Sequence, residues 1–183
     1  KNFTFYNTPK IVSGYTKNCL KIVNSLYGKV VKKTVKSSEI RYAETAKIFE
    51  NIYRAVNIAL VNEMKFLLNK MNMDVNKIID LASTKPFGFS EFRPGPGVGG
   101  HCIPIDPLYL AWIAKKNGFD SKFIKLASDI NINTTKKITY EIIKIAKKTK
   151  TKKILMIGLS YKKNIEDKRE SASIKIFQKL IEK

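Results

Sequence analysis

The longest regular pattern of apolar and polar positions runs from about Arg41 to Met71 and contains neither glycine nor proline. Its apolar residues recur every three or four positions, which is the period of an amphipathic helix. We expect Ser37 or Ser38 to cap this helix, which spans about 45 Å. A helix of that length predicts either the spine of a bundle or a crossing with a second copy of the chain. The apolar positions are Ile48, Phe49, Tyr53, Val56, Ala59, Leu60, Met64 and Leu67.

Shorter helices are predicted on both sides of this spine from the same periodicity and from capping residues. Asp106 is expected to be the N-cap of one of them, because Pro107 then occupies the first helical position, where proline is favoured. The predicted ranges are 14–27, ended by Gly28; 75–83, capped by Asp74; 108–118; 121–148; and a helix that begins near Ser171.

Three short apolar runs, at residues 10–13, 29–35 and 152–162, predict strands. The last of them is the clearest, because its centre is continuously apolar, as in a buried strand. No earlier strand and no complete glycine-rich phosphate loop precede the first run. The sequence therefore predicts a mixed α/β protein, mainly α, whose all-helical middle is flanked by two incomplete α/β pieces.

Composition limits the classes of protein that fit this pattern. The chain has 183 residues, two cysteines and a net charge of +20, with 31 lysines but only four arginines. Dispersed lysines are typical of a solvated surface, and no nucleic-acid recognition motif accompanies them, although a polyanion-binding protein stays an alternative. We expect a cytoplasmic protein with no specific nucleic-acid partner and no membrane association, since no apolar run spans a bilayer and the first residues form no signal peptide.

Residues 95–107, GPGVGGHCIPIDP, place Cys102 in the most glycine-rich segment of the chain. Glycine lets the backbone approach a ligand closely, and the positive end of a following helix favours a thiolate. Cys102 is therefore either a nucleophile that attacks a carbonyl carbon or a small buried hydrophobic residue. Cys19 falls on the apolar face of its helix and is expected to pack there. His101 is expected to pack in the loop, because no neighbouring ligands at metal-binding spacing accompany it.

Three segments resemble the UDP-glucose/GDP-mannose dehydrogenase family, the nucleotide-sugar 6-dehydrogenases. They are AETAKIFENIYRAVNIALVNEM, KPFGFSEFRPGPGVGGHCIPIDPLYLAWIAKKNGF and ILMIGLSYKKNIEDKRESASIKI, and they occur in the family's order. The resemblance implies that residues 1–38 end an NAD-binding Rossmann-like domain. It implies that residues 39–150 form a central helical dimerisation and active-site domain, and that residues 151–183 begin a UDP-binding Rossmann-like domain.

The resemblance also implies a reaction and its residues. These enzymes oxidise the C6 alcohol of a sugar nucleotide to a carboxylate with two NAD, through a cysteine thiohemiacetal and thioester. Cys102 matches the nucleophile, and Lys47 and Asn51, four residues apart on one helix face, match the pair that stabilises the oxyanion and positions water. Asp106 matches the acid that handles this water. Residues matching the substrate contacts are Glu91, Phe92, Arg93, Pro94, Gly95, Gly99 and Lys162, and Arg169 matches a contact to NAD phosphates.

One departure bears on the substrate. UDP-glucose enzymes tend to carry an arginine about sixteen residues before the cysteine, where this chain has Pro86 with Lys85 beside it. GGHCIPIDP with KPFGF instead resembles the branch that oxidises UDP-N-acetylhexosamines for cell-surface polysaccharides. Within this branch, UDP-N-acetylglucosamine is the expected substrate. UDP-N-acetylmannosamine, UDP-N-acetylgalactosamine and UDP-glucose stay alternatives. The resemblance implies a homodimer through the central helices, and the chain by itself is expected to be inactive. A dimerisation module without catalysis is the remaining alternative.

Overall fold

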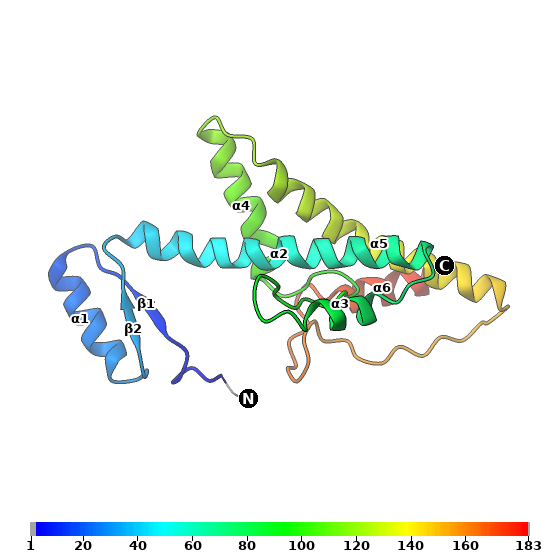
Figure 1. The fold of residues 1–183 in the computed structure, drawn as a ribbon, viewed down its shortest axis with the longest axis horizontal. Coiled ribbons are helices and arrows are strands. Elements are labelled where there is room, and N and C mark those ends of the chain that lie inside the picture. The colour runs from blue at the N-terminus through cyan, green and yellow to red at the C-terminus, as the bar shows by residue number, and fades with distance from the viewer. Residues whose placement is uncertain (1–2, 183) are drawn as a thin grey trace. The chain divides into compact units, whose positions relative to one another are not determined.

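The computed structural model describes residues 3–182. Helices dominate it, and the two strands that these residues form are short and lie near the N-terminus (Figure 1). The predicted class, mixed α/β and mainly α, is confirmed. The elements are β1 (Lys10–Val12), α1 (Lys17–Gly28), β2 (Thr34–Lys36), α2 (Ile40–Lys70), α3 (Val75–Ala82), α4 (Cys102–Lys116), α5 (Lys122–Lys148) and α6 (Ala172–Ile181).

The chain divides into two compact units, and the division falls inside α2, between Glu50 and Asn51. In the first unit, β1 and β2 pair in parallel, with Lys10 opposite Thr34, and α1 makes the connection that parallel strands require. The predicted strand at residues 29–35 is shorter than expected, because only its last two positions join β2.

Helix α1 begins where Thr16 accepts a hydrogen bond from the backbone N–H of Cys19 at 3.1 Å. No side chain of α1 is buried, and Ile22 and Leu26 are mostly exposed. The prediction that Cys19 packs into an apolar core is therefore wrong for this chain, because its thiol is exposed and bonds only locally to Thr16.

Helix α2 runs without interruption from Ile40 to Lys70, as predicted. Its buried face differs from the predicted one, because only Ala59 of the predicted apolar positions is buried, and Phe49 and Leu60 are 68% and 55% exposed. The predicted cap differs, because the helix begins directly after Glu39. The hydroxyl of Ser37 donates to the carbonyl of Glu39 at 2.8 Å instead of accepting from the first turn.

In the second unit, α4 packs on α5 and α5 packs on α6. The buried residues of α5 are small and mostly polar, and the side-chain amide of Asn131 donates to the carbonyl of Ala55 on α2 at 2.9 Å. This hydrogen bond joins α5 to α2, and most of the buried side chains of both helices are small or polar. The buried residues of α2 are Asn51, Ile52, Ala55, Ala59, Asn62 and Leu68, and those of α5 are Ala127, Ser128, Asn131, Thr134, Thr135 and Thr139.

The end of α2 is covered by α3, whose N-terminus is capped by Asp74 as predicted. The carboxylate of Asp74 accepts from the backbone N–H of Asn76 at 2.8 Å. A small apolar cluster joins the two helices and fixes where the following loop begins. Its members are Leu68, Val75 and Ile79, with Val61, Met64 and Met73 against them.

Helix α4 begins earlier than predicted. Its first residue is Cys102, and Asp106 therefore lies inside the helix instead of capping it. Pro104 falls in the first turn, where its missing N–H has no helical acceptor to lose. Pro107 is buried within the helix and removes one backbone hydrogen bond.

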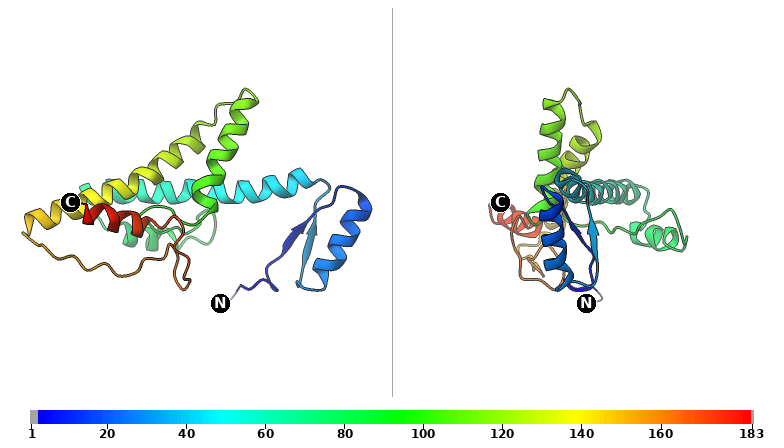
Figure 2. Two further views of the ribbon diagram at one scale, coloured as in Figure 1. Left: turned by 180° about the vertical axis from the view of Figure 1, so that it is seen from behind. Right: turned by 90° about the vertical axis from the view of Figure 1, so that its left-hand side faces the viewer.

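The predicted strand at residues 152–162 does not form. These residues run as an open trace between α5 and α6 in Figures 1 and 2, and the side chains of Leu155 and Ile157 are 84% and 88% exposed. A strand is defined by hydrogen bonds to a neighbouring strand, and residues 151–170 contain no strand to pair with it. The predicted helix after Ser171 is present as α6.

Candidate functional site

Cys102 is the first residue of α4, and its thiol is exposed. The unpaired N–H groups of a helix N-terminus carry a partial positive charge that stabilises an anion placed against them. The sequence predicted Cys102 a few residues before a helix, and the structure places it directly at the helix end. A thiolate, or an oxyanion formed next to this sulfur, therefore lies at a favourable position.

Asp106 lies one helical turn after Cys102, on the same face of α4. One of its carboxylate oxygens accepts a hydrogen bond from the side-chain amide of Asn51 at 2.5 Å. Asn51 is fully buried on α2, and its own carbonyl oxygen accepts from the guanidinium of Arg54. The structure thus brings together two predicted site residues that are far apart in the sequence, and it orients the carboxylate with a buried amide.

Lys47 belongs to the first unit and lies one turn before Asn51 on α2, as its spacing predicted. Its ammonium group forms an exposed ion pair with the carboxylate of Glu50 at 3.2 Å. This pair is weak in solvent, so the ammonium is readily released to another anion.

The loop before Cys102 is held by two side chains that the sequence did not predict. The backbone N–H of Gly95 donates to the side-chain oxygen of Asn62 on α2, and the hydroxyl of Thr135 on α5 donates to the carbonyl of Pro96, both at 2.9 Å. The sequence carries one indication of this role, because Asn62 follows Asn51 by eleven residues. That spacing is three helical turns and places both amides on the same face of α2.

The end of the same loop lies against the segment that precedes α6. The N–H of Gly100 donates to the carbonyl of Arg169 at 3.0 Å. A side chain on Gly99 would bring a Cβ within 2.6 Å of the Cβ of Tyr161 and within 3.0 Å of the carbonyl oxygen of Glu170. The close contact between the two segments therefore requires glycine at position 99.

We expect Gly99→Ala to lower the free energy of unfolding by about 1–3 kcal/mol, because overpacking at a tight contact forces the backbone to move. Gly28→Ala is the matched control, since nothing lies within 4 Å of a Cβ built at Gly28. Thermal denaturation of the two variants checks this expectation. Equal melting temperatures would show that the contact at Gly99 is loose.

Charged groups surround the Gly100–Arg169 hydrogen bond. The guanidinium of Arg169 pairs with the carboxylate of Asp167 at 2.7 Å and holds the pKa of Asp167 down at about 2, with a smaller contribution from His101. The same hydrogen bonds raise the pKa of Arg169, and Tyr161 and Cys102 add smaller electrostatic contributions. The predicted NAD contact Arg169 therefore lies within electrostatic range of the thiol.

A hollow of about 240 Å³ opens between the glycine loop, the segment around Tyr161 and the start of α6. It is lined by two of the predicted substrate contacts, Gly99 and Lys162, together with Gly97 and Ser171. The structure thus brings a lysine from the C-terminal segment to the loop that carries the cysteine. A cation beside a glycine-rich backbone suits an anionic ligand.

The earlier part of the loop serves as an anchor. The guanidinium of Arg93 pairs with the carboxylates of Glu91 and Asp80, and the ring of Phe92 packs edge-on against Tyr53 with ring centroids 5.9 Å apart. Arg93 therefore ties the loop to Asp80 on α3 and to Glu91 within the loop itself, and Phe92 packs on α2. Pro94 connects these residues to Gly95. Arg93 was assigned through the resemblance to the family's substrate loop, and its partner Asp80 was not predicted.

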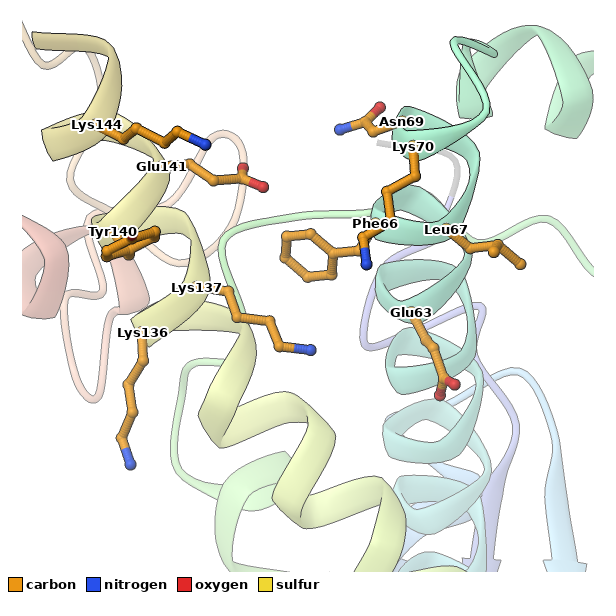
Figure 3. A pocket seen from close by; sticks show the side chains of 10 residues that line it. All are labelled: Glu63, Phe66, Leu67, Asn69, Lys70, Lys136, Lys137, Tyr140, Glu141 and Lys144. Carbon is orange, nitrogen blue, oxygen red and sulfur yellow. The ribbon is translucent and has the colours of Figure 1, made fainter. Parts of the chain in front are cut away.

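A larger hollow, of about 740 Å³, lies between α2 and α5. Figure 3 shows the ring of Phe66 from one helix and that of Tyr140 from the other, with lysine side chains around them. None of the predicted site residues lines it. The predicted catalytic and substrate-binding residues therefore lie away from this hollow.

Two kinds of feature are absent from residues 3–182. No three His, Cys, Asp or Glu side chains in this range are placed to hold a metal ion. None of the helices in this range is both long and apolar enough to cross a membrane.

Known proteins resemble this chain over nearly its whole length. The chain is 38% identical to Protein CapL of Staphylococcus aureus, over 100% of this chain and 44% of CapL. It is 35% identical to the UDP-N-acetyl-D-glucosamine 6-dehydrogenase of Pseudomonas aeruginosa, over 94% of this chain and 42% of that protein. The structure superposes on the UDP-N-acetyl-mannosamine dehydrogenase Cap5O from S. aureus with a TM-score of 0.84 and 32% identity, over 97% of this chain and 42% of Cap5O.

The chain therefore spans less than half the length of these relatives. The central-domain model of a nucleotide-sugar dehydrogenase family matches residues 41–133, which include α2, α3, α4, the cysteine loop and the first part of α5. These are the elements that carry Asn51, Cys102 and Asp106. By sequence and by fold, the chain belongs to the UDP-glucose/GDP-mannose dehydrogenase family.

Proposed function

We propose that this chain carries the nucleophile of an NAD-dependent enzyme that oxidises the C6 hydroxyl of a UDP-N-acetylhexosamine to the uronic acid. UDP-N-acetylglucosamine is the first candidate, and UDP-N-acetylmannosamine and UDP-glucose are the alternatives. The proposal rests above all on one observation. Cys102 lies at the positive end of α4, one turn before a carboxylate that Asn51 holds in place.

The first half of the reaction converts the alcohol to a thiohemiacetal. The C6 carbon loses a hydride to NAD and its hydroxyl loses a proton, which gives an aldehyde. The sulfur of Cys102 then adds to the aldehyde carbon, and its proton passes to the carbonyl oxygen. Negative charge that develops on this oxygen is stabilised by the N-terminus of α4 and by the ammonium of Lys47.

The second half releases the acid. A second hydride leaves the thiohemiacetal carbon for another NAD, and a proton leaves its hydroxyl, which gives a thioester on Cys102. Water adds to this carbonyl, and the carboxylate of Asp106 accepts a proton from the water. Asn51 orients both Asp106 and the attacking water, and loss of the thiol from the tetrahedral carbon restores Cys102.

We assign the remaining predicted residues to binding of the sugar nucleotide and of NAD. Lys162 and Gly99 line the hollow beside the cysteine loop and suit the anionic part of a sugar nucleotide. Gly95 and Pro94 continue this loop, and the ion pairs of Arg93 and Glu91 anchor it. NAD supplies the hydride acceptor when it is bound, and within this chain we assign only Arg169 to its phosphates.

The proposed domain organisation follows the relatives. Residues 1–38 end the NAD-binding domain, residues 39–150 form the central domain, and residues 151–183 begin the UDP-binding domain. We assign homodimerisation to the central helices, because α4 exposes large side chains such as Tyr109 and Trp112, which are 59% and 53% exposed. The proposed setting is the cytoplasm, and the proposed use of the product is synthesis of a cell-surface polysaccharide.

The test is an assay of the complete gene product that carries this sequence, with NAD and each of the three UDP-sugars in turn. We expect two NADH per molecule of sugar, because alcohol to carboxylate is a four-electron oxidation. The sugar with the highest kcat/KM identifies the substrate. One NADH per sugar would contradict the thioester route, and none with any sugar would favour the dimerisation module.

A further inference from the structure

We propose that Thr135 is a positioning residue for the cysteine loop, and that its hydroxyl sets the backbone from which Cys102 is presented. This proposal rests on the function proposed above, in which Cys102 is the nucleophile. It adds a residue of α5, a helix that contributes none of the predicted catalytic or substrate-binding groups.

The first observation is the direction of the hydroxyl. Thr135 is 7% exposed, and its hydroxyl donates to the carbonyl of Pro96 in the loop. Its buried neighbours behave differently, because Thr134 donates to the carbonyl of Ile130 and Thr139 to that of Thr135, both inside α5. A threonine on a helix usually bonds back to its own turn in this way. Thr135 instead uses its hydroxyl on another segment.

The second observation is the backbone at Gly97. Its φ of +134° is an angle that residues with a side chain rarely adopt, and a Cβ there would lie 2.5 Å from the hydroxyl oxygen of Thr135. Glycine therefore lets the chain turn directly over Thr135. The hydrogen bond fixes the carbonyl just before the turn, and the packing fixes the turn itself.

The third observation is that the loop is held from two helices. Asn62 on α2 accepts from the N–H of Gly95, and Thr135 on α5 bonds the next residue, Pro96. Asn62 is fully buried, so its position is as fixed as that of Thr135. Two consecutive loop residues, which lie seven and six positions before Cys102, are thus tied to two different helices. The loop cannot shift along one helix without breaking its bond to the other.

The test compares three variants of the complete gene product. Thr135→Val removes the hydroxyl and keeps the shape of the side chain, whereas Thr135→Ser keeps the hydroxyl. Thr134→Val is the matched control, because it removes a buried threonine hydroxyl next in sequence that has no bond to the loop. The readouts are hydrogen exchange of the amides at 97–100, measured by mass spectrometry, and kcat and KM for the UDP-sugar.

We expect Thr135→Val to speed exchange at these amides about tenfold and to raise KM about tenfold, which is the size of one hydrogen bond. Thr135→Ser should restore both, and Thr134→Val should change neither. A purely structural role would instead give both valine variants the same small loss of stability and leave KM unchanged. That result overturns the proposal.

Hydrogen exchange keeps this test separate from the test of the reaction. If the unmodified protein oxidises no UDP-sugar, the proposed function fails, and exchange at 97–100 still decides whether Thr135 fixes the loop. If the protein is active and Thr135→Val matches Thr134→Val in every readout, only the role of Thr135 fails.

Discussion

Cys102→Ala is expected to lower the rate of uronic acid formation by a factor on the order of 10³ or more, because the variant has no nucleophile to form the thioester. The first hydride transfer needs no sulfur, so at most one NADH per sugar should appear. The thiol is exposed at the start of α4, so the free energy of unfolding should change by no more than about 0.5 kcal/mol. Quantification of the acid product measures the rate, and NADH absorbance measures the number of NADH per sugar.

Cys19 provides the control for this experiment. It is the only other cysteine of the sequence, its thiol is also exposed, and it lies on α1 in the first unit. Cys19→Ala should leave the rate and the stoichiometry unchanged. Two NADH per sugar at an undiminished rate in Cys102→Ala would remove Cys102 from the mechanism, whatever Cys19→Ala does.

Asn51→Ala is expected to lower the free energy of unfolding by about 2–3 kcal/mol and the melting temperature by roughly 4–12 °C. The side chain of Asn51 is fully buried between Arg54 and Asp106, and it both accepts and donates a hydrogen bond. Without this side chain, the carboxylate of Asp106 and the guanidinium of Arg54, both partly buried, each lose a hydrogen-bond partner. Thermal denaturation measures the loss of stability. We also expect kcat to fall, because the carboxylate of Asp106 is no longer oriented by Asn51.

Asn57→Ala is the control for this second experiment. The amide of Asn57 bonds only the carbonyl of Tyr53 in its own helix, so its removal should change stability by no more than about 0.5 kcal/mol. Similar melting temperatures for the two variants would mean that water replaces the side chain of Asn51. The buried amide would then contribute little to the fold.

Helices α2, α3 and α5 could be predicted within a few residues because their signals are local. The long apolar pattern of α2 has no glycine or proline to interrupt it, and Asp74 caps α3 as its position indicated. The predicted start of α4 was too late in the sequence, and this error also came from a local signal. Asp106 followed by Pro107 is typical of a helix start, and only packing shows that Pro107 is accommodated inside the helix.

The strand expected at 152–162 shows a different limit. Its apolar sequence fits a buried strand, but a strand also needs partners, and their presence cannot be inferred from the residues of the run itself. The site shows the same contrast. Cys102 was a candidate nucleophile from its glycine-rich loop alone. The resemblance to a family decided its role and gave the roles of Asn51 and Asp106, whereas Asn62 and Thr135 were missed. Their role depends on the path of a loop that no periodic pattern describes.

The open segment between α5 and α6 has a consequence for handling this protein. Residues 153–159 place isoleucine, leucine and methionine side chains in sequence, and Leu155 and Ile157 are almost entirely in contact with water. Such a stretch has high β propensity and is free to add to the edge of another sheet. When residues 1–183 are produced alone, this stretch is the place where self-association and chaperone binding should begin. A charged residue in place of Leu155 is the natural substitution to keep that chain in solution.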